Sequence, residues 1–267
     1  MIIRGRRKVF NKLILFLALS LYYSSPVAPF YHLDERQSGA PNKAFKVGEK
    51  LTFSIGYEFI PAGKSVLFVE SIDTVDGKSA YHITSKTRSH WFFDPFFKVR
   101  DEIETYMDSN SFKSIRFRKK LREGAYSYDY SAEFDNDSLK AVSVSPNGRR
   151  TVDIPEFTLD ILSAMYYMRT LPIEVGKTWT VTVLDNDKLY PLELVVERRE
   201  RVSTKAGTFD CLVVEPKLKS GGLFKHEGRI TVWVTDDHRK IPVLMKSKAI
   251  IGSIVVELES AEGLVDP

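Results

Sequence analysis

Residues 115–134 read IRFRKKLREGAYSYDYSAEF, and this stretch decides the fold class of the chain. In its first part apolar residues alternate with Arg116, Arg118 and Lys120, and in its second part aromatic residues recur at every other position. A period of two is that of a β-strand, whose side chains point alternately to opposite faces. The Glu123-Gly124 step between the two parts is a turn signal. The stretch therefore predicts two antiparallel strands joined by a short turn.

The same pattern continues along the chain from Gly48 onward. Runs of β-branched and aromatic residues are separated by turn residues at short spacing, which is typical of antiparallel sheets and barrels. These turns include Pro61-Ala62-Gly63, Asp76-Gly77, Asp108-Ser109-Asn110, Asn147-Gly148, Asp185-Asn186-Asp187, Ala206-Gly207, Gly221-Gly222 and Asp236-Asp237. We therefore expect an all-β, mainly antiparallel fold.

Residues 158–170 break this pattern and predict one helix. Thr158 suits the N-cap, Asp160 would lie in the first turn, and Pro172 follows the end of the segment. Apolar residues occur nearly all round the helix, which indicates burial on several sides. The helix is expected to lie against or inside a curved sheet.

The helix divides two segments that resemble each other. Residues 48–53 (GEKLTF) match residues 176–181 (GKTWTV) at an offset of 128 residues, and the same offset relates Gly124 to Gly252. Two pseudo-repeats, about 48–135 and 176–261, would form two related half-sheets in a barrel-like or sandwich body. Coincidence among turn glycines is the alternative.

Four segments in this order carry a resemblance to a known family: residues 48–53 (GEKLTF), 97–101 (FKVRD), 159–169 (LDILSAMYYMR) and 206–211 (AGTFDC). Together they resemble the domain-of-unknown-function 3108 (DUF3108) family over roughly residues 45–262. The resemblance implies an exported bacterial protein with a signal peptide and a β-rich fold. It implies no activity and no catalytic residues.

The N-terminal residues predict export. Residues 1–28 combine an apolar run at 13–23 with five preceding cations, Arg4, Arg6, Arg7, Lys8 and Lys12. This run is too short for the ~20 apolar residues of a membrane span and suits a signal peptide. Residues 29–46 read as a linker and residues 47–262 as one β-rich domain. We expect a periplasmic protein, with an uncleaved N-terminal anchor or a buried N-terminal helix as alternatives to cleavage.

The charge balance argues against nucleic acid as a partner. The chain has 39 Lys and Arg against 35 Asp and Glu, so without the five N-terminal cations the body is almost neutral. Nucleic-acid recognition needs a clustered basic face. The one cysteine, Cys211, allows no intrachain disulfide, and its strand-like surroundings predict a buried thiol that behaves as a small apolar side chain.

No catalytic or metal-binding motif stands out, so we expect no enzyme, no cofactor and no metal site. His82 and His90 would be roughly 27 Å apart on a regular strand at ~3.4 Å per residue, too far to share a metal. The other histidines are His32, His226 and His238. The sequence has no Gly-x-Ser-x-Gly elbow and no glycine-rich phosphate loop. A hydrolase whose site converges only in three dimensions is the third functional hypothesis.

The most unusual local feature is an aromatic cluster around the turn Asp94-Pro95. Its members are Trp91, Phe92, Phe93, Phe96 and Phe97. These side chains could close an open end of the sheet as an apolar plug. They could instead form an exposed lip that admits an apolar ligand or contacts a membrane or a partner, since exposed apolar patches usually mark interaction sites.

Tyr126, Tyr128 and Tyr130 form the second candidate site. On one face of a strand they could line a ligand cavity, because each ring has an apolar body and a hydroxyl. An inward core face or a cross-strand ladder would explain the same spacing. The leading hypothesis is a non-enzymatic periplasmic binding or carrier module for an apolar or amphipathic envelope molecule. The alternative is a scaffold that binds another envelope protein through the aromatic loop or a sheet edge.

Overall fold

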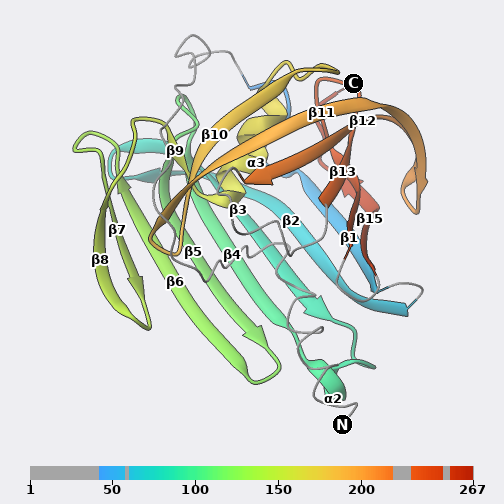
Figure 1. Ribbon diagram of the computed structural model, residues 1–267, viewed down its shortest axis with the longest axis horizontal. Coiled ribbons are helices and arrows are strands. Elements are labelled where there is room, and N and C mark those ends of the chain that lie inside the picture. The colour runs from blue at the N-terminus through green and yellow to red at the C-terminus, as the bar shows by residue number, and fades with distance from the viewer. Residues whose placement is uncertain (1–41, 58–59, 219–229, 249–252, 267) are drawn as a thin grey trace.

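The computed structural model describes residues 42–57, 60–218, 230–248 and 253–266 (Figure 1). The expected signal peptide, most of the expected linker and the turn at Gly221-Gly222 lie outside these residues. The strands are β1 (Lys50–Tyr57), β2 (Ile60–Val75), β3 (Lys78–Ser89), β4 (Arg100–Asp108), β5 (Ser114–Glu123), β6 (Tyr126–Asp135), β7 (Lys140–Ser145), β8 (Gly148–Asp153), β9 (Thr158–Leu159), β10 (Thr178–Asp185), β11 (Lys188–Thr204), β12 (Gly207–Leu218), β13 (Ile230–Thr235), β14 (Pro242–Lys248) and β15 (Ser253–Glu262). The two described helices are α2 (Asp94–Phe97) and α3 (Ile161–Thr170).

All these strands form one 15-stranded sheet in the order β8-β7-β6-β5-β4-β3-β2-β1-β15-β14-β13-β12-β11-β10-β9. Neighbouring strands are antiparallel except β9 and β10, which pair in parallel. The sheet curls around α3, so its concave face forms the inside of an open, barrel-like body (Figure 1). Strand twist accumulates across so many strands and produces this curl. The expected all-β, mainly antiparallel, barrel-like fold is confirmed.

The stretch at 115–134 forms the expected hairpin of β5 and β6. Glu123 pairs with Tyr126 and Lys119 pairs with Tyr130. Gly124 in the turn has a φ of 60° and lies under the ring of Phe97, where a Cβ atom would stand 2.9 Å from a ring carbon. Both the positive φ and the close approach therefore require glycine at this turn.

The two segments matched in the sequence enter the sheet in the same way. The N–H of Gly48 donates to the carbonyl of Val69 at 2.9 Å, and the N–H of Gly176 donates to that of Val196, also at 2.9 Å. The long hairpins β2–β3 and β11–β12 each have a register shift directly after that valine. These features extend the sequence likeness, and an internal duplication stays a prediction.

The expected helix near 158–170 is α3, with one correction at its start. Asp160, not Thr158, is the N-cap: its Oδ1 accepts the N–H groups of Leu162 and Ser163, both at 2.9 Å. Thr158 and Leu159 instead form the short strand β9. Asp160 is a stronger cap than Thr158 would be, because its carboxylate oxygen accepts both of the free N–H groups at the start of the helix.

The core lies between α3 and the concave face of the sheet. Tyr166 of α3 is fully buried and packs edge-on against Phe45, with ring centroids 4.9 Å apart. Cys211 belongs to the same core cluster, and burial raises the pKa of its thiol to about 12. This placement agrees with the expected buried thiol.

Candidate functional site

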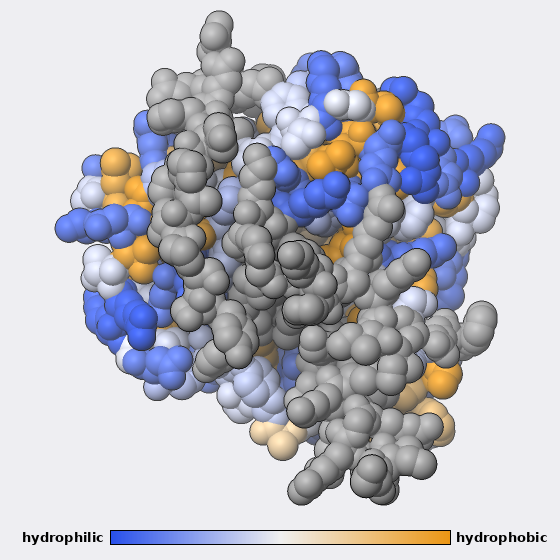
Figure 2. All heavy atoms as spheres, in the orientation of Figure 1, coloured by the Kyte–Doolittle hydropathy of each residue, from blue (hydrophilic) through white to orange (hydrophobic). Residues whose placement is uncertain are grey.

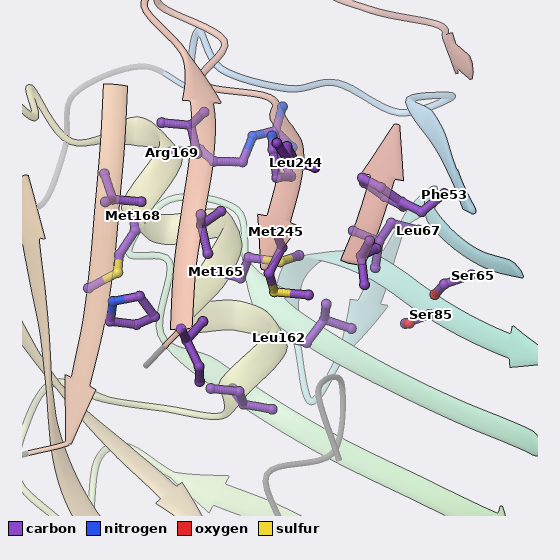
Figure 3. Close-up of a pocket in the computed structure, with 18 of the residues that line it drawn as sticks. Phe53, Ser65, Leu67, Ser85, Leu162, Met165, Met168, Arg169, Leu244 and Met245 are labelled. Atoms are coloured by element: carbon purple, nitrogen blue, oxygen red, sulfur yellow. The ribbon is translucent and has the colours of Figure 1, made fainter. Parts of the chain in front are cut away.

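A cavity of about 240 Å³ lies between α3 and the concave face of the sheet (Figure 3). Its walls come from α3 and from strands of both halves of the chain, and nearly all the lining side chains are apolar. In the space-filling view, hydrophobic residues are visible between hydrophilic ones over β11 and β12 (Figure 2). The cavity is thus a mainly apolar site.

The sheet wall of the cavity is a continuous row of paired apolar residues. Ile55 of β1 pairs with Val256 of β15, which pairs with Met245 of β14. Met245 pairs in turn with Val232 of β13, and Val232 pairs with Val214 of β12. All five residues line the cavity. Because directly paired residues on one sheet face have adjacent Cβ atoms, the row forms an unbroken apolar strip across five strands.

The helix wall is one face of α3. Ile161, Met165 and Met168 line the cavity and follow the spacing that places side chains on one side of a helix. Met245 faces them from the sheet (Figure 3), so three of the five methionines of the chain meet at this site. Unbranched methionine side chains adapt to irregular apolar ligands. This wall can therefore adjust to what enters.

The first turn of α3 is anchored to the sheet through Asp160. Its Oδ2 accepts hydrogen bonds from the hydroxyls of Thr105 and Ser114, both at 2.6 Å, and from Ser163 at 2.7 Å. Asp160 is completely buried, and both its oxygens are satisfied. A buried carboxylate with this many donors holds the helix start against β4 and β5.

The last turn of α3 is anchored by a buried ion pair. Arg169 donates to both carboxylate oxygens of Glu49, at 2.6 and 2.8 Å, and also to the carbonyls of Ala44 and Arg239. Its guanidinium lies 5.1 Å from the ring centroid of Tyr166. Arg169 borders the cavity, but its donors are committed to these partners, so it is not a free anion site.

Polar groups border the cavity at the end formed by β2, β3 and β4. The hydroxyls of Ser65 and Thr87 bond each other at 2.9 Å, and the buried hydroxyl of Ser85 has no hydrogen-bond partner among the described residues. Ser65 and Ser85 lie on the side away from Arg169 (Figure 3). Asp101 pairs with Thr87, and burial raises the pKa of this carboxyl to about 6 against the opposing N–H bond from Arg122. This end can bond a polar group of a ligand. Lys240 also lines the cavity, and its Nζ donates to the carbonyl of Asp237 at 3.3 Å.

The five aromatic residues predicted as a ligand site lie at one end of the sheet, around α2, and do not line the cavity. Trp91, Phe92 and Phe96 are exposed by 76%, 57% and 79%. Phe93 is half-buried against Ile55, Ala62 and Ile254. Phe97 covers the Gly124 turn. The structure therefore brings these residues together, with three of them facing solvent.

The three predicted tyrosines face the concave side of β6 but are separate from the cavity. Tyr126 and Tyr128 stack with ring centroids 6.1 Å apart, and Tyr130 is buried. Lys119 lies over the rings of Tyr128 and Tyr130 and forms a buried ion pair of 2.5 Å with Asp185. Burial raises the pKa of Tyr128 to about 12. Here the tyrosines pack around a charged pair.

Sequence reasoning missed the cavity-lining residues of α3 and β15. The signal was present in the repeat, because Tyr126 and Tyr128 correspond to Ile254 and Val256 at the offset of 128 residues. Ile254 and Val256 line the cavity. The cavity thus lies at positions that the offset relates to the predicted tyrosines, and the tyrosines themselves do not line it.

The described part of the chain holds no group of three or more His, Cys, Asp and Glu residues arranged to bind a metal ion. His82 stacks on Tyr106 with ring centroids 4.4 Å apart, on the convex face. Neither α2 nor α3 is long and apolar enough to cross a membrane.

Comparison with known proteins places the chain in a family. Its structure is similar to that of a β-barrel-like protein of domain of unknown function DUF1849 from Brucella abortus, with a TM-score of 0.55 and 15% identity over 83% of this chain and 99% of that one. A protein from Parabacteroides distasonis described as a lipoprotein matches at a TM-score of 0.33 and 10% identity, over 85% and 100% of the two chains. An exported protein with a YmcC-like fold from Bacteroides fragilis matches at 0.36 and 12%, over 83% and 97%.

The first of these similarities supports the barrel-like fold, and the other two are too distant to carry an argument. No curated protein matches the chain. The model of a protein family of unknown function, DUF3108, matches residues 52–259, which is most of the chain. The protein is therefore a member of the DUF3108 family.

Proposed function

We propose that this protein is a non-enzymatic binding or carrier module of the bacterial cell envelope. Its ligand would be an apolar or amphipathic molecule, such as a lipid or another acyl compound, with the apolar part held between α3 and the sheet. The observation that carries the proposal is the apolar cavity of about 240 Å³. Apolar concave sites with a few polar groups are the usual form of small-molecule sites.

The size of the cavity supports a hydrocarbon ligand. An engineered apolar cavity of about 150 Å³ stays dry and binds benzene, while complete ligand pockets span roughly 300–1,000 Å³. At 240 Å³ the site matches part of a ligand, for example a segment of an acyl chain. Burying about six methylene groups would contribute about 5 kcal/mol at ~0.8 kcal/mol each, without any catalytic group.

The polar end supports an amphipathic ligand over a pure hydrocarbon. The unpaired hydroxyl of Ser85 and the bonded pair Ser65–Thr87 offer hydrogen bonds at one side of the cavity, whereas the lining cations Arg169 and Lys240 already donate to protein groups. A buried hydroxyl without a partner costs free energy, so a ligand group that bonds it would gain affinity. The ligand would then lie with its polar group toward β2 and β3 and its tail toward the methionines.

The N-terminal residues support a periplasmic location. The five cations and the apolar run at 13–23 have the composition of a signal peptide. Pro26 and Pro29 interrupt the small-residue pattern of a cleavage site, so release and retention on an uncleaved anchor are the two forms of this proposal.

Replacing Met165 by Trp is expected to lower the affinity for a fluorescent apolar probe, N-phenyl-1-naphthylamine, at least about tenfold. The larger ring would occupy the cavity, and a few methylene equivalents of lost burial are worth more than 1.4 kcal/mol, which is tenfold. Fluorescence titration of the purified protein measures this change. Val232→Phe fills the same cavity from β13 and serves if the helix variant misfolds.

Ile72→Trp is the matched control, because Ile72 is exposed on β2 and does not line the cavity. It should bind the probe as the natural protein does. Equal affinity in all variants, with circular dichroism showing that each is folded, would exclude the cavity as the binding site. Mass spectrometry of lipids that copurify from the native envelope then identifies the natural ligand class, and a cavity that carries no envelope lipid would contradict the carrier role.

A further inference from the structure

We propose that the end of the sheet that carries α2 is a docking surface for an anionic lipid bilayer. The aromatic side chains of Trp91, Phe92 and Phe96 would enter the interface between head groups and acyl chains. The cations beside them would face the lipid phosphates. This proposal goes beyond ligand binding in the cavity and does not require the cavity to be occupied.

The first support is the exposure of three large aromatic side chains at one place. Trp91, Phe92 and Phe96 are exposed by 76%, 57% and 79%, and the rings of Trp91 and Phe92 meet edge-on with centroids 6.4 Å apart. A cluster of this kind costs free energy in water and marks an interaction site. Tryptophan and phenylalanine are the residues that partition into the membrane interface.

The second support is the rigid base under these side chains. Asp94 accepts hydrogen bonds from Ser89 at 2.5 Å and from Arg100 at 2.5 and 3.2 Å. These bonds lower the pKa of Asp94, the one to Arg100 most, so the carboxylate stays charged. The N–H of His90 donates to the carbonyl of Ala62 at 2.8 Å. The loop is thus preorganised, and docking need not order it.

The third support is the charge of the convex face next to the loop. Lys64 of β2 pairs with Arg88 of β3, which pairs with Arg100 of β4, so three cations form a row directly beside α2. Lys98 follows α2 in the chain, and Lys86 lies one exposed position further along β3. Anionic leaflets attract such cations with about 1 kcal/mol each near the surface.

Three of these cations, Lys86, Arg88 and Lys98, are exposed and available to a membrane. Lys64 and Arg100 form ion pairs with Glu259 and Asp94. Arg88 and Lys98 are exposed and have no ion-pair partner within the described ranges. Unpaired cations beside exposed aromatics favour a lipid surface over a protein partner, because lysine is depleted in protein interfaces, whereas membrane-binding surfaces combine Lys and Arg with Trp and Phe.

The docking end also adjoins the cavity. Phe93, which anchors the loop, packs on Ile55 and Ile254, and these two residues line the cavity. Figure 1 shows α2 at the far end of β3 and β4 from α3, so the membrane would lie at this end of the sheet. Phe93 therefore links the docking surface to two residues of the cavity wall.

The test uses protein purified from the envelope and sedimentation with large vesicles. Binding is expected to vesicles of phosphatidylglycerol and phosphatidylcholine in equal parts, and to weaken at high salt and on pure phosphatidylcholine. The triple variant Trp91→Ser, Phe92→Ser, Phe96→Ser should lose at least about tenfold in partition coefficient. Arg88→Gln with Lys98→Gln should lose several-fold on the anionic vesicles only. A blue shift of tryptophan emission on binding, absent in Trp91→Phe, reports the loop directly.

Matched controls carry the same kinds of change elsewhere. Ile72→Ser with Val144→Ser removes exposed apolar side chains, and Arg149→Gln with Lys140→Gln removes exposed cations of β7 and β8. Both should bind as the natural protein does. An equal loss of vesicle binding in the test and control variants would overturn the proposal. So would a folded natural protein that does not bind vesicles, including one that instead captures an envelope protein through the aromatic side chains. A cavity-filled variant such as Met165→Trp should still dock, which separates this test from that of ligand binding.

Discussion

Replacing Glu49 by Gln is expected to lower the free energy of unfolding by about 3–5 kcal/mol, because it leaves a buried guanidinium without its counter-charge. Glu49 is fully buried, Arg169 is 4% exposed, and both carboxylate oxygens accept from that guanidinium. Two carbonyls and two aromatic rings also surround Arg169, but none of them carries the missing charge. Urea denaturation followed by circular dichroism measures the change.

A double variant distinguishes the ion pair from general damage to the core. Glu49→Leu combined with Arg169→Met replaces both charges by apolar groups of similar size, and such replacements of buried pairs are often close to neutral. Glu174→Gln removes the acid of an exposed pair with Lys177 and should leave the stability nearly unchanged, because solvent screens such pairs. A loss below 1 kcal/mol for Glu49→Gln would show that water reaches the pair and that it does not fix the end of α3.

The sheet could be predicted from local patterns because strands that are consecutive in the sequence are mostly paired with each other in the sheet. From β1 to β8 every strand pairs with the next one, so alternation and turn residues were sufficient. The hairpin at 115–134 is the clearest case: its period of two and its glycine turn describe the observed register. The pairing of β1 with β15 could not be read in this way, since no local pattern joins the two ends of the chain.

The cavity was harder to predict, because it forms where the apolar side chains of α3 and of the sheet leave a space between them. Val214, Val232 and Val256 have the alternation of any half-buried strand, and nothing in that pattern distinguishes a filled core from a gap. The methionines of α3 were visible, but a helix that is apolar all round predicts burial only. The aromatic residues at 91–97 were predicted as a site instead, because five aromatic side chains around one turn form an unusual local pattern.

The buried ion pairs escaped sequence reasoning for a related reason. Glu49 and Arg169 are 120 residues apart, and Lys119 and Asp185 are 66 apart. In the sequence Lys119 is one of several cations in a strand with an exposed basic face. Only the alternation with Lys120 assigns it to the inward face, and a lone inward cation gives no indication of its partner.

Replacing Lys119 by Met is expected to cost about 3–5 kcal/mol of unfolding free energy at pH 8, because it would leave the buried Asp185 without its counter-charge. The two side chains are 1% and 4% exposed, and the distance from Nζ to Oδ1 is 2.5 Å. Lys120→Met is the control, since the neighbouring side chain is exposed on the convex face and should change the stability by less than about 0.5 kcal/mol. Thermal and urea denaturation of both variants measure the difference.

The cost of Lys119→Met should depend on pH. Burial raises the pKa of Asp185, and the charge of Lys119 opposes that rise, so the pKa rises further when the lysine is removed. A carboxyl with a higher pKa in the folded state than in the unfolded state binds a proton on folding, and its protonation stabilises the fold as the pH falls through the folded pKa. The loss of unfolding free energy caused by Lys119→Met should therefore be smaller at pH 5 than at pH 8. An equal deficit at both values would mean that Asp185 stays ionised without Lys119, as it would if Asn186 and solvent supplied the missing donors.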